Sequence, residues 1–233
     1  MNTLFPEIQV VFEHPEFVII DKPCGVSVHR EPHLDSKSNA ASIIELVQSQ
    51  IEDVPYWLVH RLDKVTSGLL ILAKSESAAS ELSQLFANRS IQKYYLAISD
   101  KKPKKKQGSV IGDMEKSRQG LWKLCHSKAS PAITRFFSKG LGGKRMFILK
   151  PETGKTHQLR VALKSLGSPI LGDTRYSGSK ADRTYLHAYS LNFEFQGEEV
   201  NIVHPPKQGE HFSEESFHSL LMDYSSPQQL KWP

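Results

Sequence analysis

The chain has 233 residues, of which 39% are hydrophobic, and its mean hydropathy is −0.40. That length suffices for one compact domain with a hydrophobic core, or for two small ones. Its longest apolar runs are only a few residues, whereas a membrane span needs about 20, and the N-terminus lacks the pattern of a secretory signal. The two cysteines, Cys24 and Cys125, fit neither a zinc motif nor a disulfide framework. The sequence therefore predicts a cytoplasmic protein with no membrane partner and no metal site.

Positive charge is concentrated in one short run. The formal net charge is +5, and five lysines gather in the stretch KKPKKK. Such a cluster can neutralise several phosphates of a nucleic acid, or it can form a solvated loop without a partner. Both interpretations stay open at this point. The lysines are Lys101, Lys102, Lys104, Lys105 and Lys106.

The first part of the chain predicts three strands and two helices. Apolar stretches at 8–13 and 17–22 surround a short turn and predict a hairpin. Ser42 and Glu45 form a capping-box pattern, which predicts that a helix begins after Ser42. A buried strand is predicted at 68–74, followed by an amphipathic helix. The apolar stripe of that helix consists of Ala78, Leu82, Leu85 and Phe86.

The second part predicts further strands at 91–98, 132–138 and 145–150, and a late hairpin of 191–195 with 200–204. Two helices are predicted here from apolar residues at helical spacing. The first ends at a glycine followed by a proline, and the second lies near the C-terminus. Their apolar residues are Leu159, Ala162, Leu163 and Leu166 in the first, and Phe217, Leu220, Leu221 and Tyr224 in the second.

Strands and helices are mixed in this order without a regular βαβ alternation. The order predicts an α+β fold with a largely antiparallel mixed sheet flanked by helices. We expect residues 1–233 to form a single domain. Residues 101–120 lack apolar periodicity and are predicted to form a basic surface loop. Residues 207–233 are predicted to form a helical C-terminal extension.

The segment 60–74, HRLDKVTSGLLILAK, places a polar cluster and a turn directly before an apolar strand. Asp63 is therefore predicted to lie in a loop at the beginning of a buried strand, where rigid structure can orient its side chain. The alternative is that Asp63 only caps the turn, by accepting hydrogen bonds from Thr66 or Ser67. For an isolated motif of this kind the capping role is the more common one.

A second polar segment, 151–176, contains a helix with an arginine beside its apolar stripe. Arg160 lies at the edge of the Leu159 and Leu163 face. An arginine in such a place usually extends its charged end to solvent. If it reaches a carboxylate instead, it can bind it through two parallel hydrogen bonds.

Taken together, these segments resemble the signature blocks of the RluA-type RNA pseudouridine synthases, in particular the short members without an S4 domain. Five blocks occur in the order of that family and cover most of the chain, from about Val10 to Pro206. Two positions depart from the usual pattern, with Lys155 in place of an arginine and Ala162 in place of a histidine. The blocks are FVIIDKPCGVSVH, HRLDKVTSGLLILAK, KYYLA, TGKTHQLRVALKSLGSPILGD and YLHAYSL.

The resemblance implies an isomerase that converts uridines of tRNA or rRNA to pseudouridine without a cofactor. By this resemblance Asp63 is the nucleophile, and Arg160 pairs with it and favours its ionised form. Tyr95 would lie against the uracil and relay a proton from C5, while Tyr94 points to the other side of its strand. Leu186 would close the apolar side of the pocket, and Arg61 would fill the space left when the target base flips out of the RNA.

Several alternatives accompany this assignment. The resemblance does not decide whether Asp63 attacks C1′ or C6 or assists a glycal path, and it implies no obligate protein partner. A catalytically silent RNA-binding protein of the same fold is a second hypothesis. It is disfavoured because binding alone does not need Asp63, Tyr95 and Arg160 together. A third is an aspartyl-phosphate phosphotransferase built on DKVTSG, but the sequence lacks a matching set of acidic metal ligands.

Overall fold

A computed structural model describes residues 6–29, 41–51 and 54–233 of the chain. Its strands are β1 (Gln9–Glu13), β2 (Phe17–Lys22), β3 (Trp57–Leu58), β4 (Ser67–Ala73), β5 (Gln92–Ser99), β6 (Gln107–Gly112), β7 (Met114–Lys116), β8 (Trp122–Leu124), β9 (Ala132–Leu141), β10 (Lys144–Pro151), β11 (Leu186–Phe195) and β12 (Glu198–Val203). Its α-helices are α1 (Ile43–Gln50), α2 (Glu76–Ala87), α3 (Gln158–Ser165) and α4 (Glu215–Leu221).

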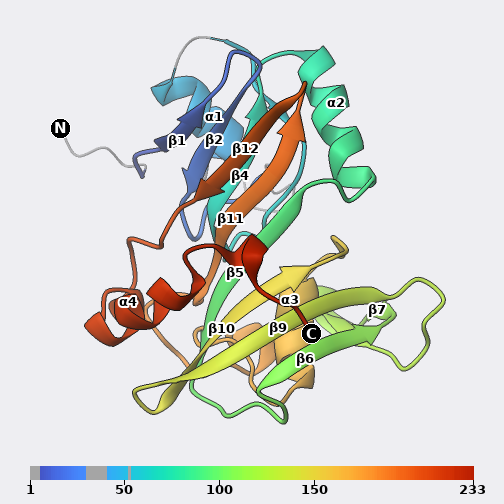
Figure 1. Ribbon diagram of the computed structural model, residues 1–233, viewed down its shortest axis with the longest axis vertical. Helices are drawn as coiled ribbons and strands as arrows, with labels where there is room; N and C mark the ends of the chain where they lie inside the picture. Colours follow the sequence, from blue (N-terminus) through green and yellow to red (C-terminus); the bar gives the residue numbers. More distant parts are fainter. Residues whose placement is uncertain (1–5, 30–40, 52–53) are drawn as a thin grey trace.

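One large sheet runs through the molecule in the order β1-β2-β4-β11-β5-β10-β9-β6, with β12 and β3 paired to β11 and β4. All of these pairs are antiparallel except β4 with β11, where His187 aligns with Ser67. The structure thus confirms the predicted α+β class with a largely antiparallel mixed sheet (Figure 1). The pairing also places β11 between β4 and β5, although β11 comes about a hundred residues later in the sequence.

The first core lies around β2, β4, α1 and α2. Every residue of β4 is buried, which fits the apolar run LLILA that follows its first two residues. The capping box predicted at Ser42 is present, because the Ser42 hydroxyl accepts a hydrogen bond from the Glu45 amide and the Glu45 carboxylate accepts one from the Ser42 amide. Late-chain residues of β11, such as Phe193 and Phe195, complete this core.

The second core surrounds β5, β9 and β10, and is covered on both faces (Figure 1). Leu159 and Leu163 of α3 are buried on one side. On the other side the C-terminal segment crosses the sheet, and Trp232 stacks on Tyr94 with 5.7 Å between ring centroids. Tyr94 is fully buried there. Successive side chains of a strand point to opposite faces, so Tyr95, the next residue of β5, faces α3.

The prediction of a loop over residues 101–120 is wrong for most of its length. Strands β6 and β7 and a short 3-10 turn occupy 107–120, and β6 forms the edge of the large sheet beside β9. The short, polar strand β6 lacks the apolar pattern from which strands are predicted. Within 101–106 the backbone is fixed to the end of α3, since the Lys104 amide donates to the Leu166 carbonyl over 2.9 Å.

The C-terminal extension contains α4 and three 3-10 turns, so its regular structure is helical. The last apolar residue of the predicted helix, Tyr224, belongs to a separate 3-10 turn at 222–224. Within the described ranges, no helix combines the length and the apolar character needed to span a bilayer.

Candidate active site

Backbone hydrogen bonds hold the loop that carries Asp63, both within its own turn and to an adjoining loop. The Thr66 amide donates to the Asp63 carbonyl over 2.9 Å, which closes the turn before β4. On the adjoining loop, the Gly25 amide donates to the Lys64 carbonyl over 2.8 Å. Beneath both loops the fully buried ammonium of Lys22 donates to the carbonyls of Pro23 and Val26, at 2.8 Å each. Burial lowers the pKa of Lys22 to about 8.

His60 attaches the same loop to the middle of β4. Its Nε2 atom accepts a hydrogen bond from the Ile71 amide at 2.9 Å, so the ring proton is on Nδ1. The ring stacks on Phe86 of α2, with centroids 4.4 Å apart. Burial lowers the pKa of His60 to about 3, so the ring is neutral and acts as a structural acceptor.

The beginning of β4 is held against β11 by a close approach of two backbones. Gly68 has a φ of +103°, and a Cβ atom at this position would clash with the Ala188 carbonyl. One residue earlier, the Ser67 hydroxyl accepts a hydrogen bond from Arg183 and donates to Nδ1 of His187, at 2.6 and 2.8 Å. Together these contacts fix the end of the loop from which Asp63 projects.

Arg160 is buried and binds two carboxylates. Its Nη1 atom donates to Oδ2 of Asp63 at 3.3 Å. Its Nε and Nη2 atoms bind both oxygens of Asp173, at 2.7 and 2.9 Å. Burial opposes the charge of Arg160, but the bonds to Asp173 and Asp63 outweigh it and raise the arginine pKa. The guanidinium also lies 4.7 Å from the ring centroid of Tyr176. The alternative of a surface arginine is thereby excluded.

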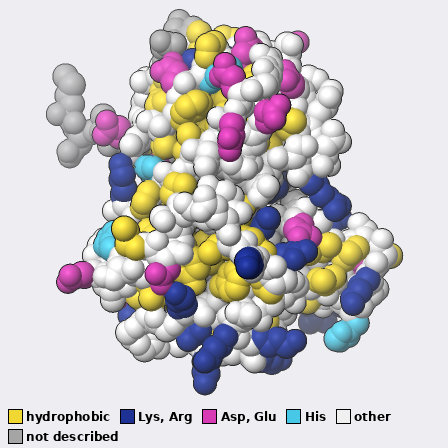
Figure 2. Space-filling view, in the orientation of Figure 1, with side chains coloured by type: hydrophobic (Ala, Val, Ile, Leu, Met, Phe, Trp, Pro, Cys, Tyr) yellow, Lys and Arg dark blue, Asp and Glu magenta, His cyan; other side chains and the backbone are white. Residues whose placement is uncertain are grey.

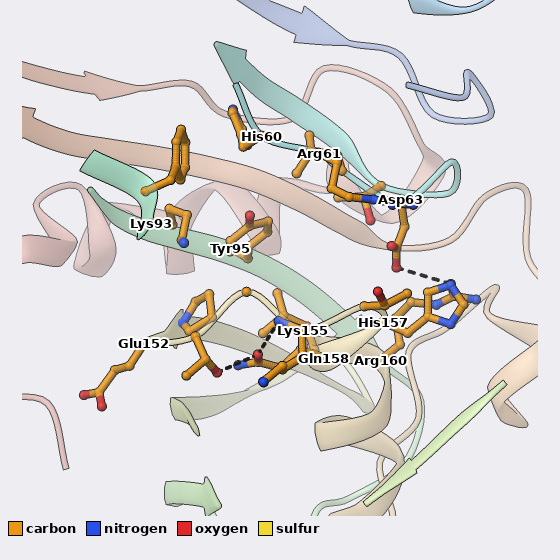
Figure 3. Close-up of a pocket in the computed structure, with 18 of the residues that line it drawn as sticks. His60, Arg61, Asp63, Lys93, Tyr95, Glu152, Lys155, His157, Gln158 and Arg160 are labelled. Atoms are coloured by element: carbon orange, nitrogen blue, oxygen red, sulfur yellow. Dashed lines mark hydrogen bonds and ion pairs between the residues drawn. The ribbon is translucent and has the colours of Figure 1, made fainter. Parts of the chain in front are cut away.

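Asp173 was not predicted from the sequence as a site residue, yet it is the closer partner of Arg160. Its side chain is 2% exposed, and the Arg160 side chain is 4% exposed. A bidentate pair of this kind fixes the plane of the guanidinium. Because that plane is fixed, Nη1 is directed toward Asp63 on the opposite wall (Figure 3).

His157 begins α3 in a left-handed conformation, with a φ of +58°. No side chain caps this helix, and His157 instead forms a 2.8 Å hydrogen bond through Nδ1 to the Tyr176 hydroxyl. Burial lowers the pKa of His157 and outweighs the nearby charge of Asp63. The unusual backbone at His157 orients the first turn of α3, from which Arg160 projects.

Tyr95 and Leu186 come from the neighbouring strands β5 and β11. Tyr95 is half-buried and faces the same space as Asp63. Burial raises the pKa of Tyr95, and the charge of Asp63 raises it further, so the phenol is neutral at physiological pH. Leu186 is buried in the wall of the same space.

One cavity of about 520 Å³ lies between these elements (Figure 3). Its lining includes Asp63, Tyr95, Arg160, Leu186 and the exposed Arg61, so five of the residues predicted for the site meet in one place. A nucleobase with its ribose fits such a volume. Among the residues that the structure describes, no cluster of three potential metal ligands occurs.

The five lysines of the 101–106 run are exposed and do not line the cavity. They lie near the C-terminal end of α3, whereas the cavity lies at the N-terminal end of that helix. The eight residues of α3 span about 12 Å at 1.5 Å per residue.

Comparison with known proteins identifies the family. Residues 16–165 match the model of the RNA pseudouridylate synthase family. The chain belongs to the RNA pseudouridine synthases. An RNA pseudouridine synthase of Haemophilus influenzae, described as uncharacterized, is 54% identical over 88% of this chain and 90% of its own. A ribosomal large subunit pseudouridine synthase C of Rickettsia bellii is 33% identical over 83% of this chain and 66% of its own.

Solved structures support the same fold for this synthase. The human RNA pseudouridylate synthase domain containing 4 has a TM-score of 0.70 and 26% identity, over 91% of this chain and 92% of the human one. The enzyme is therefore an isomerase acting on RNA, as the resemblance of its motifs predicted. The blocks at 60–74 and 93–97 both lie within the matched residues.

Proposed function

We propose that this synthase converts uridines in structured RNA, either tRNA or rRNA, to pseudouridine with Asp63 as the nucleophile. The observation that carries the proposal is the cavity in which the Asp63 carboxylate contacts Arg160 and faces Tyr95. The reaction breaks the N1–C1′ bond and joins C1′ to C5. One proton leaves C5 and one is added at N1, so the balance requires no other reactant.

The depth of the site supports base flipping. A uracil within an RNA helix is stacked and paired, and the Asp63 side chain is only 18% exposed inside the cavity. The target nucleotide therefore has to leave its stack, which costs a few kcal/mol. Arg61 is exposed at the cavity and carries no carboxylate partner among the described residues. We infer that its guanidinium occupies the space that the base leaves.

Arg160 acts in this scheme as a fixed positive charge beside Asp63. Because both oxygens of Asp173 already bind the guanidinium, its position does not depend on substrate. It favours the ionised carboxylate that a nucleophile needs and stabilises that charge when Asp63 is released from the nucleotide. Attack at C1′, attack at C6 and a glycal path are all compatible with this arrangement.

The role of Tyr95 is tested by the pair Tyr95→Phe and Tyr94→Phe. Tyr95→Phe retains the ring against the uracil but removes the hydroxyl proposed to relay the C5 proton. We expect normal RNA binding and a reaction that stops before tritium leaves C5. Tyr94→Phe is the matched control, because Tyr94 faces the C-terminal segment and its hydroxyl bonds to Gln92. Tritium release and RNA binding are measured for both, and damage by the Tyr94 change alone would contradict the proposed role.

The charge distribution supports an RNA substrate that lies across the second core. Residues 91–183 hold 21 of the 30 Lys and Arg but only 6 of the 25 Asp and Glu. These residues therefore carry a surplus of 15 positive charges, whereas the rest of the chain has a net negative charge. In Figure 2, Asp and Glu gather over the upper part and Lys and Arg over the lower part. A backbone of phosphates is attracted to the basic part and repelled by the acidic part.

The lysine run offers a test that separates recognition from chemistry. Replacing Lys101, Lys102, Lys104, Lys105 and Lys106 with Ser should weaken RNA binding without slowing the bound reaction. For each phosphate that the variant no longer binds, the dependence of log affinity on log salt should fall by about 0.7 to 0.9. Binding from low to moderate salt and single-turnover rates at saturating RNA are measured for both proteins. Parallel salt dependences would show that the run is a solvated surface only.

The proposal as a whole is tested on RNA from cells that lack the enzyme, in which its target uridines are unmodified. Total RNA labelled with [5-³H]uridine is isolated from a strain that lacks this gene and incubated with the purified protein. Tritium release is the expected result, and mapping the new pseudouridines then separates tRNA from rRNA targets. No release from any RNA would contradict the proposal and favour a silent RNA-binding protein.

A further inference from the structure

Lys93 is a cation inside the cavity to which the proposed reaction gives no role. It lies on β5 two residues before Tyr95, so both side chains leave the same face of the strand. Its side chain is half-buried and its ammonium is 5.4 Å from the ring centroid of Phe86. In Figure 3, Tyr95 lies between Lys93 and Asp63 along the cavity. Seen from the proposed nucleophile, Lys93 therefore lies beyond Tyr95.

No carboxylate of the described residues forms an ion pair with Lys93. Phe86, over whose ring the ammonium lies, is apolar, and the nearby His60 is neutral. Burial lowers the pKa of Lys93 without a compensating negative charge. Lys74, by contrast, pairs with Glu13 at 2.9 Å. A partly buried ammonium without a counter-ion is disfavoured unless an anion binds beside it.

The position of Lys93 identifies the kind of anion. The cavity wall around it includes the exposed Ala87 and Arg89, at the C-terminal end of α2, so this part of the cavity is its mouth. When a nucleotide flips, its base enters the pocket while the strand on either side passes across the mouth. The anions at the mouth are then phosphodiesters of the RNA backbone. The uracil itself is neutral.

We propose that Lys93 binds a backbone phosphate adjoining the target uridine and thereby fixes how far the flipped nucleotide enters the cavity. This inference rests on the proposed function. It assigns a substrate contact to a residue at the beginning of β5, beside Phe86 of α2. Arg89 lines the same cavity and can contact the same strand.

The variants Lys93→Met, Lys93→Arg and Lys74→Met test this contact. Methionine retains an unbranched apolar stem over Phe86 but removes the charge, and arginine restores it. Lys74→Met is the control, because it removes one charge from the opposite, acidic part of the molecule. The probe is the [5-³H]uridine-labelled total RNA described above. We expect Lys93→Met to raise the RNA concentration for half-maximal rate by at least about fivefold, to change the rate at saturation little, and to reduce the salt dependence by about 0.7 to 0.9.

The outcomes separate the contact from the reaction. If the wild type releases tritium but Lys93→Met matches Lys74→Met in affinity and salt dependence, the phosphate contact is refuted. A lower saturating rate with unchanged affinity also refutes it and assigns Lys93 to the chemical step. If the wild type itself releases no tritium, the proposed function fails first. Once the target is mapped, a methylphosphonate on its 5′ or 3′ side should weaken wild-type binding but leave Lys93→Met unaffected, which identifies the phosphate.

Discussion

The Asp63→Asn protein is expected to fold, to bind RNA and to release no tritium from [5-³H]uridine RNA. The amide is nearly the same size as the carboxylate but is not a nucleophile. Loss of a nucleophile typically lowers the rate by more than about 10³-fold. Folding should change little, because Arg160 retains both hydrogen bonds to Asp173 when its contact with Asp63 is altered. Tritium release, filter binding and thermal unfolding of the purified variant measure the three properties.

A matched control for this change is Asp223→Asn, which makes the same chemical substitution at an exposed ion pair with Lys139. Exposed pairs of this kind contribute about 0 to 1 kcal/mol, so the control should stay active and stable. Release of tritium by Asp63→Asn at the wild-type rate would exclude Asp63 as the nucleophile. Loss of activity together with loss of folding would instead assign Asp63 a structural role.

Arg160→Met should lose both activity and stability, because two carboxylates depend on this guanidinium. Asp173 is almost fully enclosed, and without Arg160 it would remain as a buried charge without its partner. Breaking a buried pair in this way typically costs about 3–5 kcal/mol of folding free energy. Denaturant unfolding measures that loss. Turnover at saturating RNA should also fall, because Asp63 loses its neighbouring positive charge.

Two further variants separate these effects. Arg135→Met removes an arginine whose partner, Glu152, is partly exposed, and a loss of about 0 to 1 kcal/mol is expected there. Asp173→Asn leaves Arg160 charged but weakens its orientation, so it should lower turnover more than RNA affinity. An Arg160→Met protein with normal stability and turnover but weaker RNA binding would show that the arginine contacts phosphate.

Much of the fold follows from local patterns in the sequence. The hairpin of β1 and β2 and the buried strand β4 each have the apolar period of the observed element. The capping box before α1 was also readable, because it joins residues three positions apart. Strand β6 was missed because its alternation of small, polar and apolar residues resembles a loop. β6 is a strand because it pairs with β9, and this pairing cannot be predicted from the sequence of β6 alone.

Some residues of the candidate site could be predicted from the sequence, and others are apparent only from the structure. The motifs around Asp63, Tyr95 and Arg160 carry recognisable residue patterns, and the structure places these three side chains around one cavity. Asp173 was overlooked because nothing in its local sequence predicts that Arg160, 13 residues earlier in the chain, will be buried against it. Lys93 was overlooked for a similar reason, since its lack of a counter-ion is a property of the surrounding walls. Such environments depend on contacts between distant segments.

The insertion of β11 between β4 and β5 has a consequence for the timing of activity during synthesis. Asp63 and Tyr95 leave the ribosome long before the strand that joins their own strands in the sheet. Until residue 195 has emerged, β4 and β5 lack their shared neighbour and the cavity lacks Leu186. Pairing of such distant segments is slow compared with local folding. We therefore expect the cavity to be completed only after most of the chain has been synthesised.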